Sequence, residues 1–388
     1  MIELLNEISD ERAIAMKILK KEPMLTVSVI AAIISLFITP PSKELLHAID
    51  WHTLGTLFMM LTILEGFKKE HIFNPLLRLA SRMGYLVTLS LFLVFSVFFS
   101  SMFVTNDVSL IIFVPLTILL FRAAKREEFI LPLLAMENIA AVRGSLLMPF
   151  GSPQNLFIYS QSGMSAAAFI GIMFPIWIIS LFLLILFVAF PYRKNLKEKA
   201  LIADADFTVP DNELNKKKQI AYLVLFAMVL FTIVSRTTYW PYAVIIVAVM
   251  VAIIDYKILI KTDYVLLLTF LCFFIFSSSI AANETIAAFL HRVVGHHEYV
   301  VSIVLSQFIS NVPASIVLYP FSENVKALLY GLDSAGLCTL IGSLASVINY
   351  RIYVREYPDS GLKFIKYFTL ISLAFFAFVA LPGYFISR

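Results

Sequence analysis

Long apolar stretches separated by short charged segments recur along the whole chain and constrain its fold more than any other feature. Apolar residues make up 60% of the 388 residues, and charged residues only 14%, about half the charged share of an ordinary soluble domain. A water-soluble fold could not bury so much apolar surface. We therefore predict an all-α polytopic membrane protein, and we exclude soluble enzymes, nucleic-acid-binding proteins and disulfide-rich secreted modules.

Two kinds of apolar stretch are present. A complete bilayer crossing needs about 20 apolar residues. The candidates for complete crossings are Met24–Ile38, Thr53–Phe67, Phe169–Phe190, Ile220–Ser235, Tyr242–Ile254, Val265–Ile280 and Phe364–Phe385. Two further runs, Tyr85–Phe121 and Val300–Phe321, are interrupted by the polar sequences VTNDVS and SQFISNVPAS. Each interrupted run predicts a re-entrant helical hairpin with a polar tip, and each is followed by a helix broken near its middle, at 146–159 and 337–350.

The distribution of basic residues supports the hairpin interpretation. If both interrupted runs return to the side they left, 24 of the 30 Lys and Arg residues are cytoplasmic, five are outside, and Arg143 is intramembrane. Membrane proteins carry their excess of Lys and Arg on the cytoplasmic side. A complete crossing by the first run would instead move the basic segment 122–128 outside. We therefore predict a protein of the cytoplasmic (inner) membrane with its N-terminus inside and its C-terminus outside.

The order of the segments predicts two inverted-topology repeats, because one hairpin enters from the cytoplasm and the other from outside. Asn and Pro are nine residues apart in both hairpins, at Asn106 and Pro115 and at Asn311 and Pro320. The predicted division is 1–84 (N-terminal amphipathic lead-in and scaffold helices), 85–190 (first half of a transport domain), 191–218 (cytoplasmic linker), 219–297 (scaffold helices of the second repeat) and 298–388 (second half of the transport domain).

Polar residues occupy the two hairpin tips and the two helix breaks. Irregular backbone at membrane depth survives only where protein buries it or where it lines a wet cavity. Half-helix N-termini there suit anions, and freed carbonyl and side-chain oxygens suit small cations. The predicted substrate-binding residues are Thr105, Asn106, Gly151, Ser152, Asn155, Ser310, Asn311, Gly342, Ser343 and Ser346. For the tip residues the alternative is helix capping alone.

Asp107 is the strongest single candidate, because an ionisable residue at membrane depth is costly and usually functional. We predict that Asp107 binds a coupling cation, sodium or a proton, together with Asn106 and Asn311. The alternative is a capping carboxylate paired with Arg143. Arg143 could instead contact an anionic substrate.

The other polar motifs predict neither an enzyme nor a resident cofactor. The tract of His291, His296 and His297 lacks the ligand spacing of a metal site, so no metal is predicted. The chain has no phosphate-binding G-x-x-x-x-G-K-[ST] motif and no nucleophile–base pair at membrane depth. Cys272 and Cys338 lie in apolar segments and indicate no disulfide framework. The driving energy must therefore come from an ion gradient or from a partner, and a soluble ATPase on the linker stays an alternative.

Four motifs in this order resemble the ion transporter superfamily: TNDVSLIIFVPL, GSPQNLFIY, SNVPASIVLYPF and GSLASVINYRIYVRE. That group includes the arsenite-pump and sodium–proton antiporter D families and the divalent anion:sodium symporters, which are citrate transporter-like. The similarity runs from Pro23 to the C-terminus. It implies a homodimeric elevator-type carrier, with a scaffold domain at the dimer contact and a mobile transport domain that carries both hairpins.

The residues and the resemblance together predict a secondary active transporter of a small anion, either a carboxylate or an inorganic oxyanion. Arsenite or antimonite efflux and sodium/proton antiport are alternatives within this class. An ion channel is a more distant alternative, because two opposed hairpins closing on one midplane site favour alternating access. The expected partners are the anion, the coupling cation, the lipid bilayer and a second copy of the chain, with no nucleic acid.

Overall fold

The computed structural model describes residues 22–40, 45, 47, 49–193, 198–199 and 214–388. The predicted lead-in at 1–21 and most of the predicted linker 191–218 lie outside these residues. Within the described ranges the regular structure is helical, apart from one isolated bridge between Tyr85 and Lys199. Seven helices are long and apolar enough to cross a membrane. The prediction of an all-α polytopic membrane protein is therefore confirmed.

The helices follow one another along the chain in two similar series separated by α11. The first series is α2 (Pro23–Ile38), α4 (Trp51–Lys69), α5 (Asn74–Ser81), α6 (Leu86–Val104), α7 (Asn106–Ala123), η1 (Glu127–Phe129), α8 (Ile130–Gly144), α9 (Pro153–Ser162), α10 (Ala166–Ala189) and η2 (Phe190–Tyr192). After α11 (Lys216–Ser235) come α12 (Trp240–Lys261), α13 (Tyr264–Ala281), α14 (Glu284–Val294), α15 (Glu298–Ile309), α16 (Asn311–Leu318), η4 (Tyr319–Phe321), α17 (Val325–Ala335), α18 (Leu344–Glu356), η5 (Pro358–Ser360) and α19 (Gly361–Ser387).

Five of the predicted crossings coincide with helices of span length, namely α10, α11, α12, α13 and α19. The predicted segments at Met24–Ile38 and Thr53–Phe67 form α2 and α4, which do not meet that criterion of length and hydropathy. The arms of the first interrupted run, α6 and α7, have 19 and 18 residues and reach span length. Those of the second, α15 and α16, have 12 and 8 residues. Only the arms of the second run thus fall well short of the roughly 20 residues of a complete crossing.

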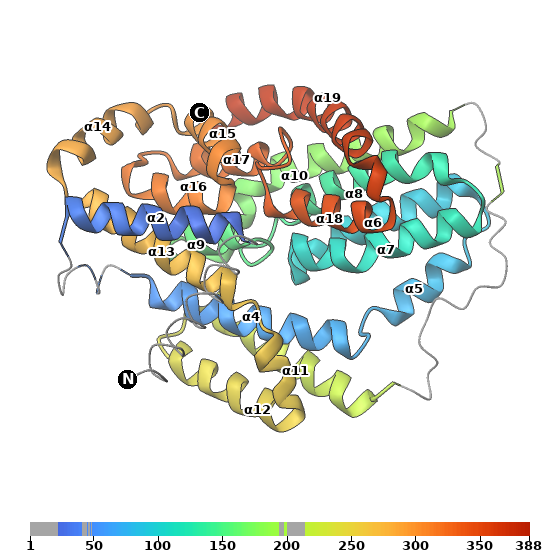
Figure 1. Cartoon of the computed structure of the whole chain (residues 1–388), viewed down its shortest axis with the longest axis horizontal. Coiled ribbons are helices and arrows are strands. Elements are labelled where there is room, and N and C mark those ends of the chain that lie inside the picture. The colour runs from blue at the N-terminus through green and yellow to red at the C-terminus, as the bar shows by residue number, and fades with distance from the viewer. Residues whose placement is uncertain (1–21, 41–44, 46, 48, 194–197, 200–213) are drawn as a thin grey trace, which may run out of the picture.

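The helices are divided here into two groups, which also contact each other where α13 packs on α16. The first, called here the α4 group, consists of α2, α4, α11, α12 and α13. In it α2 packs on α13, and α4 packs on both α11 and α12. The second, called the hairpin group, consists of α6 to α10 and α15 to α19. In it α6 packs on α8, α15 on α17, and α7 on α18. In the view of Figure 1, α4, α11 and α12 run along the lower side, below the hairpin group.

Both interrupted runs turn at one residue with the same unusual backbone. Thr105 joins α6 to α7 with φ 70° and ψ 156°, and Ser310 joins α15 to α16 with φ 69° and ψ 156°. Both broken helices are also present, because α8 and α9 are separated at 145–152, and α17 and α18 at 336–343. An extended serine precedes the second piece of each, with φ −149° at Ser152 and φ −147° at Ser343. The predicted helix–tip–helix and broken-helix segments are therefore confirmed.

Glycine lets α8 approach α6 until their backbones touch. A Cβ atom at Gly144 would lie 1.9 Å from the carbonyl oxygen of Phe98, so no larger residue fits there. Gly144 is the last residue of α8, and the chain turns back directly after it, because Gly151 lies against the carbonyl of Ser145.

The second half of the chain contains a similar contact, between α17 and α15. A Cβ atom at Gly331 of α17 would lie 2.5 Å from the carbonyl oxygen of Tyr299 in α15. The second tip and the second break meet directly, because the backbone N–H of Asn311 donates to the Gly342 carbonyl at 3.1 Å.

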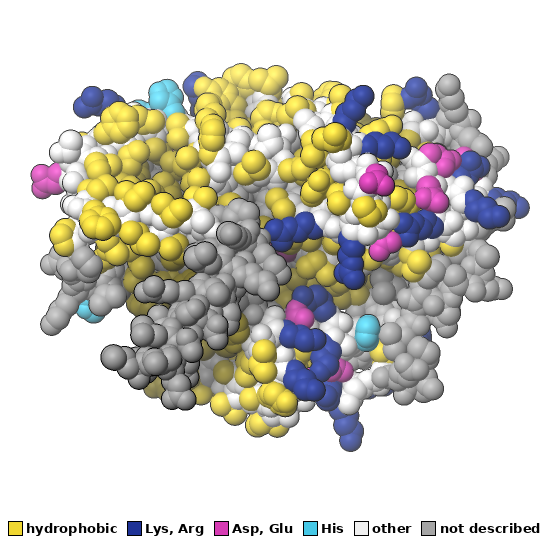
Figure 2. All heavy atoms as spheres, in the orientation of Figure 1, with side chains coloured by type: hydrophobic (Ala, Val, Ile, Leu, Met, Phe, Trp, Pro, Cys, Tyr) yellow, Lys and Arg dark blue, Asp and Glu magenta, His cyan; other side chains and the backbone are white. Residues whose placement is uncertain are grey.

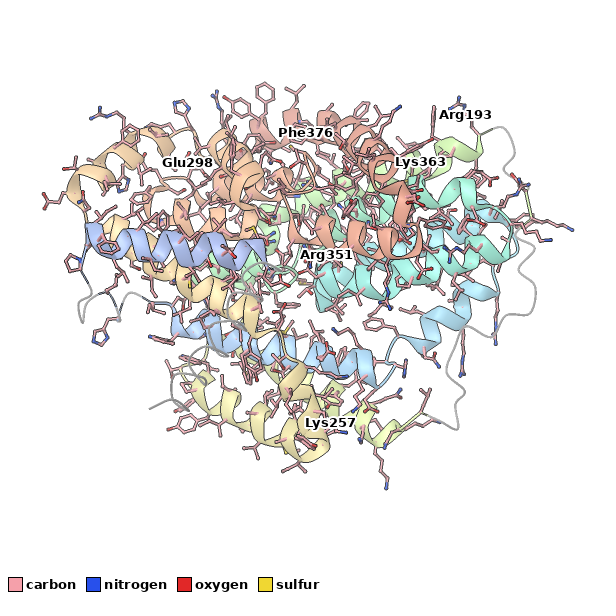
Figure 3. All side chains as sticks on the ribbon, in the orientation of Figure 1. Arg193, Lys257, Glu298, Arg351, Lys363 and Phe376 are labelled. Atoms are coloured by element: carbon pink, nitrogen blue, oxygen red, sulfur yellow. The ribbon has the colours of Figure 1, made fainter. Side chains whose placement is uncertain are left out.

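Charged side chains are distributed unevenly over the face seen in Figure 2. Lys and Arg side chains gather mostly toward the right of this view, whereas apolar side chains cover much of the left. Figure 3 places Arg193 and Lys363 toward the right and Glu298 toward the left. The apolar helices run between these two ends.

Candidate functional site

A cavity of about 540 Å³ lies between the α4 group and the hairpin group. On the side of the α4 group it is lined by α4 and by the junction of α12 and α13. On the other side it is lined by the first hairpin tip and by residues of both broken helices, namely Thr105, Asp107, Ser152, Pro153, Leu344 and Ile348. Segments far apart in the sequence thus meet around one space.

The wall contributed by the α4 group carries both apolar and charged residues. Leu57, Met60, Leu61 and Leu64 supply apolar surface. Charged residues come from the end of α4 and from the α12–α13 junction, namely Glu65, Lys68, Lys261 and Asp263. Lys68 and Glu65 form an ion pair, and Asp263 accepts a hydrogen bond from the backbone N–H of Leu266 at 3.0 Å. The cavity therefore offers charges of both signs opposite the hairpin tip.

At the first tip, Thr105 and Asp107 line the cavity where α7 begins. Asn106 Oδ1 accepts the backbone N–H of Asp107 at 2.9 Å. The hydroxyl of Ser109 donates to the Thr105 carbonyl at 3.0 Å. Asp107 Oδ1 is buried and has no hydrogen-bond partner in the part of the chain that the structure describes. A carboxylate oxygen beside a cavity is thus available to a ligand.

The first break is shaped by Gly151, where a Cβ atom would lie 2.2 Å from the Ser145 carbonyl oxygen. Pro153 then begins α9, a position that suits proline because its missing N–H would be unpaired there anyway. Ser152 and Asn155 are buried, and the Ser152 hydroxyl and both amide atoms of Asn155 lack partners among the described residues. The break thus presents unsatisfied polar groups next to a helix N-terminus.

The second tip rests on the second break. The backbone N–H of Asn311 donates to the Gly342 carbonyl at 3.1 Å, and its side-chain amide donates to the Leu332 carbonyl at 3.3 Å. A Cβ atom at Gly342 would lie 2.3 Å from the Ala335 carbonyl oxygen. The Ser310 hydroxyl and Asn311 Oδ1 are buried without a partner in the described ranges.

The predicted site residues therefore fall into two clusters. The cavity brings together Thr105, Asp107 and Ser152, with Asn106, Gly151 and Asn155 in the adjoining backbone and helix turn. Ser310, Asn311, Gly342, Ser343 and Ser346 form the second cluster, of which none lines the cavity. Asn138 of α8 links the halves, since its amide donates to the Ser346 hydroxyl at 3.0 Å. Leu344, directly after Ser343, reaches the cavity wall.

Arg143 lies beside an acid that the sequence analysis did not single out. Its Nε donates to the Ser180 hydroxyl at 2.9 Å, and a terminal nitrogen lies 3.5 Å from the Asp333 carbonyl oxygen. The Asp333 carboxylate accepts a hydrogen bond from the Gln154 amide at 3.1 Å. The acid next to Arg143 is thus Asp333 and not Asp107. The sequence does carry a signal, because Asp333 is an acid in the apolar segment 328–341, as Asp107 is in its own run.

The far end of α9 is fastened to the α4 group by a set of contacts that we call the α9 latch. Arg236, which follows α11, donates to the carbonyls of Tyr159, Ser160 (2.8 Å) and Met164 (3.0 Å). The His52 ring contacts the Ser160 hydroxyl at 2.9 Å. The Gln161 amide donates to Asp50 at 2.7 Å. The two groups thus touch at one end of α9, while the cavity separates them at the other.

Comparisons with known proteins agree on the type of protein. The sequence profile of the family described as citrate transporter (CitMHS) matches residues 14–336. The chain is similar to the inner membrane protein YbiR of Escherichia coli (strain K12), with 30% identity over 357 residues that cover 90% of this chain and 91% of that protein. It is also 29% identical over 314 residues to an uncharacterized transporter of Methanocaldococcus jannaschii, covering 80% and 83% of the two chains. The chain therefore belongs to the citrate transporter (CitMHS) family, a family of membrane transporters within the ion transporter superfamily.

Proposed function

We propose that the chain is a secondary active transporter that moves a small anion across the cytoplasmic membrane by alternating access, coupled to sodium or protons. The observation that carries this proposal is the cavity of about 540 Å³ between the two helix groups, reached by a hairpin tip and by two helix breaks. Such breaks offer free N–H groups and a positive helix end to an anion. The family description favours a carboxylate over an inorganic oxyanion as the substrate.

An inverted repeat underlies this mechanism. The tip residues Thr105 and Ser310 share one backbone conformation, as do Ser152 and Ser343 at the breaks. Corresponding helices also pack across the two halves in matching pairs. The contact of α7 with α18 matches that of α16 with α9, and the contact of α2 with α13 matches that of α12 with α4. Two repeats around one site are the usual way in which transporters build two alternating states.

In the proposed movement, the hairpin group slides past the α4 group as an elevator-type transport domain. The hairpin group corresponds to 85–190 and 298–388, and the scaffold to 1–84 and 219–297. Contacts such as that of the Arg122 guanidinium with Glu356 at 2.8 Å fasten α7 to α18 within the moving part. The scaffold forms the contact between two copies of the chain in a homodimer.

The proposed orientation places the right end of Figure 2, where most Lys and Arg side chains on that face gather, in the cytoplasm. The family relative named as an inner membrane protein favours the same membrane. With this orientation the cavity is on the cytoplasmic side of the site and the α9 latch on the outer side. The conformation described above is then the inward-facing one.

The residues have distinct proposed roles. Backbone N–H groups and polar side chains at Thr105, Ser152 and Asn155 bind the anion, with Ser310 and Asn311 completing the site from the second tip. Asp107 binds the coupling cation, because it lines the cavity and one of its carboxylate oxygens is buried without a partner among the described residues.

Sodium/proton antiport is the second candidate function. It is favoured by Asp107 and Asp263, two of the three acids that line the cavity; the third, Glu65, pairs with Lys68. A protein that only exchanges cations needs no anion at these positions, so flux measurements separate the two functions.

Uptake into proteoliposomes under imposed sodium and proton gradients tests the proposal. The panel comprises mono-, di- and tricarboxylates and arsenite, and Asp107→Asn is compared with the wild type. We expect anion accumulation in the wild type and a loss of about tenfold or more in Asp107→Asn, because coupling energies between two ligands are typically of this size. The matched control is Asp359→Asn, which removes an exposed acid of η5 and should leave uptake unchanged.

The outcomes are distinguishable. Sodium/proton exchange without anion flux moves the protein to the antiporter class. Accumulation that survives Asp107→Asn removes the coupling role from this residue and leaves it as a helix cap.

A further inference from the structure

A buried polar cluster lies behind the helix breaks, where α8, α9 and α17 meet. It consists of Arg143 from α8, Gln154 and Asn155 from α9, and Asp333 from α17, with Ser180 of α10 beside Arg143. Arg143 and Asn155 have no exposed surface, and Asp333 is 1% exposed. The cluster thus holds an acid and a base of opposite charge in the interior of the hairpin group.

The two ionisable groups are adjacent but form no ion pair among the described residues. Arg143 reaches the backbone carbonyl of Asp333 at 3.5 Å and not its carboxylate. The carboxylate accepts a hydrogen bond from Gln154 to Oδ1 at 3.1 Å and lies next to the Asn155 amide, while its Oδ2 has no partner of hydrogen-bond geometry in the described part of the chain. One terminal nitrogen of Arg143 is also unpartnered there, as are Gln154 Oε1 and both amide atoms of Asn155. A purely structural network would satisfy these groups, because each buried unsatisfied polar atom costs about 1–3 kcal/mol.

We propose that Asp333 is a proton-binding site that couples proton uptake to anion binding, with Arg143 as a fixed counter-charge. This inference rests on the proposed function. With Asp333 ionised, Arg143 and Asp333 balance each other and the empty cluster is neutral. When a proton binds to a carboxylate oxygen of Asp333, the positive charge of Arg143 remains, and an anion at the break restores neutrality.

The physical basis is the cost of an uncompensated charge in a low-dielectric interior. A state with only the proton or only the anion bound carries such a charge, whereas the empty and doubly loaded states do not. Proton and anion therefore bind together, and each raises the affinity for the other by the same factor. A proton needs only one free carboxylate oxygen, whereas a metal cation needs several oxygen ligands at once.

The cluster is close enough to the cavity for this coupling. Ser152 and Pro153 line the cavity, and the next residue, Gln154, hydrogen-bonds Asp333. An anion held at the start of α9 is therefore within one helical turn of the cluster.

Few other titratable groups face the pair. Tyr299 of α15 and Tyr330 of α17 interact with Arg143, and the Tyr330 hydroxyl donates to the Ile172 carbonyl at 2.6 Å. The one titratable residue of α9 is Tyr159, at its latched end. On α15, Glu298 is in the first turn and accepts hydrogen bonds from the backbone N–H groups of Glu323 and Asn324, both at 3.0 Å. Two further helices pack on α17: α16 contains no titratable residue, and α19 carries Lys363, Lys366 and Tyr367 near its start and Tyr384 near its end. Asp333 is consequently the acid of this cluster.

The test compares Asp333→Asn with the wild type in proteoliposomes that contain a pH-sensitive dye. Two quantities are measured: citrate accumulation driven by a pH gradient, and citrate counterflow with no gradient. Because asparagine mimics the protonated acid, we expect gradient-driven accumulation to fall about tenfold or more, while counterflow continues and citrate no longer carries protons. Asp359→Asn serves as the control, with both activities retained.

Each other result overturns the inference in a recognisable way. Proton-driven accumulation that persists in Asp333→Asn overturns it. A wild type driven by sodium alone, with no proton movement, overturns it and leaves the proposed function standing. A wild type without anion flux under any gradient contradicts both this inference and the proposed function.

If Asp333→Asn does not fold, Asp333→Glu keeps a titratable group and should retain coupling with a displaced pH profile. An unchanged profile overturns the inference.

Discussion

At the scale of single residues, the hairpin tips combine strained backbone with polar side chains. Thr105 and Ser310 have φ near 70° with ψ 156°, a region in which only glycine is comfortable. A β-branched threonine with positive φ is particularly unusual. Both tips nevertheless lack glycine, and the Ser310 hydroxyl is buried without a partner in the described ranges. The strain is therefore best explained by a need for side-chain oxygens at these points.

Thr105→Gly should separate strain from function. Relief of backbone strain is worth about 1–3 kcal/mol, and the added chain entropy of glycine costs about 0.4–1 kcal/mol. We expect a net rise in thermal stability of about 1 kcal/mol together with reduced anion uptake. Thermal denaturation of the purified protein and uptake assays measure the two effects.

Thr105→Ala is the control, because it removes the hydroxyl but keeps the strained backbone. It should lose uptake without gaining stability. A Thr105→Gly variant that is less stable than the wild type contradicts the interpretation of strain.

At the scale of elements, α9 is held at both ends by different partners. Its N-terminus meets the cavity at Ser152, and its C-terminal carbonyls are held by Arg236 in the α9 latch. A guanidinium at a helix C-terminus satisfies orphan carbonyls and complements the negative end of the helix dipole. The Arg236 side chain also stacks over the Tyr159 ring, at 4.5 Å from its centroid.

Arg236→Ala should favour the state in which the latched surfaces separate. Loss of charge-assisted hydrogen bonds worth about 1.5–3 kcal/mol shifts the balance of states by about tenfold or more. We expect a cysteine introduced at Ser160 to react correspondingly faster with a membrane-impermeant thiol reagent in Arg236→Ala than in the Arg236 background. Arg292→Ala, in the exposed part of α14, is the control and should leave the rate unchanged. Equal labelling rates in all three backgrounds would show that the latch does not hold the two groups together.

The elements most accurately predicted from the sequence are those marked by a local contrast. TNDV and SNVP interrupt apolar runs, and GSPQN supplies a glycine and a proline, so the tips and breaks were predictable. The helices α5 and α14 lack such a contrast, because their amphipathic sequences contain too many polar residues to resemble crossings. Contacts between residues far apart in the sequence have no such local signal. Arg143 and Asp333 are 190 positions apart, and only the packing of α8 near α17 brings them together.

At the scale of the whole molecule, the two helix groups are joined at one end and separated at the other. The cavity lies between α4 and the first hairpin tip, and the α9 latch closes the opposite end. A static protein would have no need for a cavity bounded by two bodies and by unsatisfied polar groups. In alternating access, by contrast, each transport cycle opens the latched surface and closes the cavity.

A reversible crosslink across the latch should therefore stop transport. His52→Cys combined with Ser160→Cys joins the two groups at side chains that are 2.9 Å apart in the wild type. After treatment with a short cleavable bifunctional thiol reagent, we expect net uptake to fall to background and to recover when the link is reduced. Cys272 and Cys338 are buried and should not compete for the reagent.

The matched control is Arg122→Cys with Glu356→Cys, which joins α7 to α18 within the hairpin group. In the proposed movement that group moves as one body, so its crosslinked form should continue to transport. Uptake that survives the latch crosslink would mean that these surfaces never separate, and alternating access would then have to occur within the hairpin group.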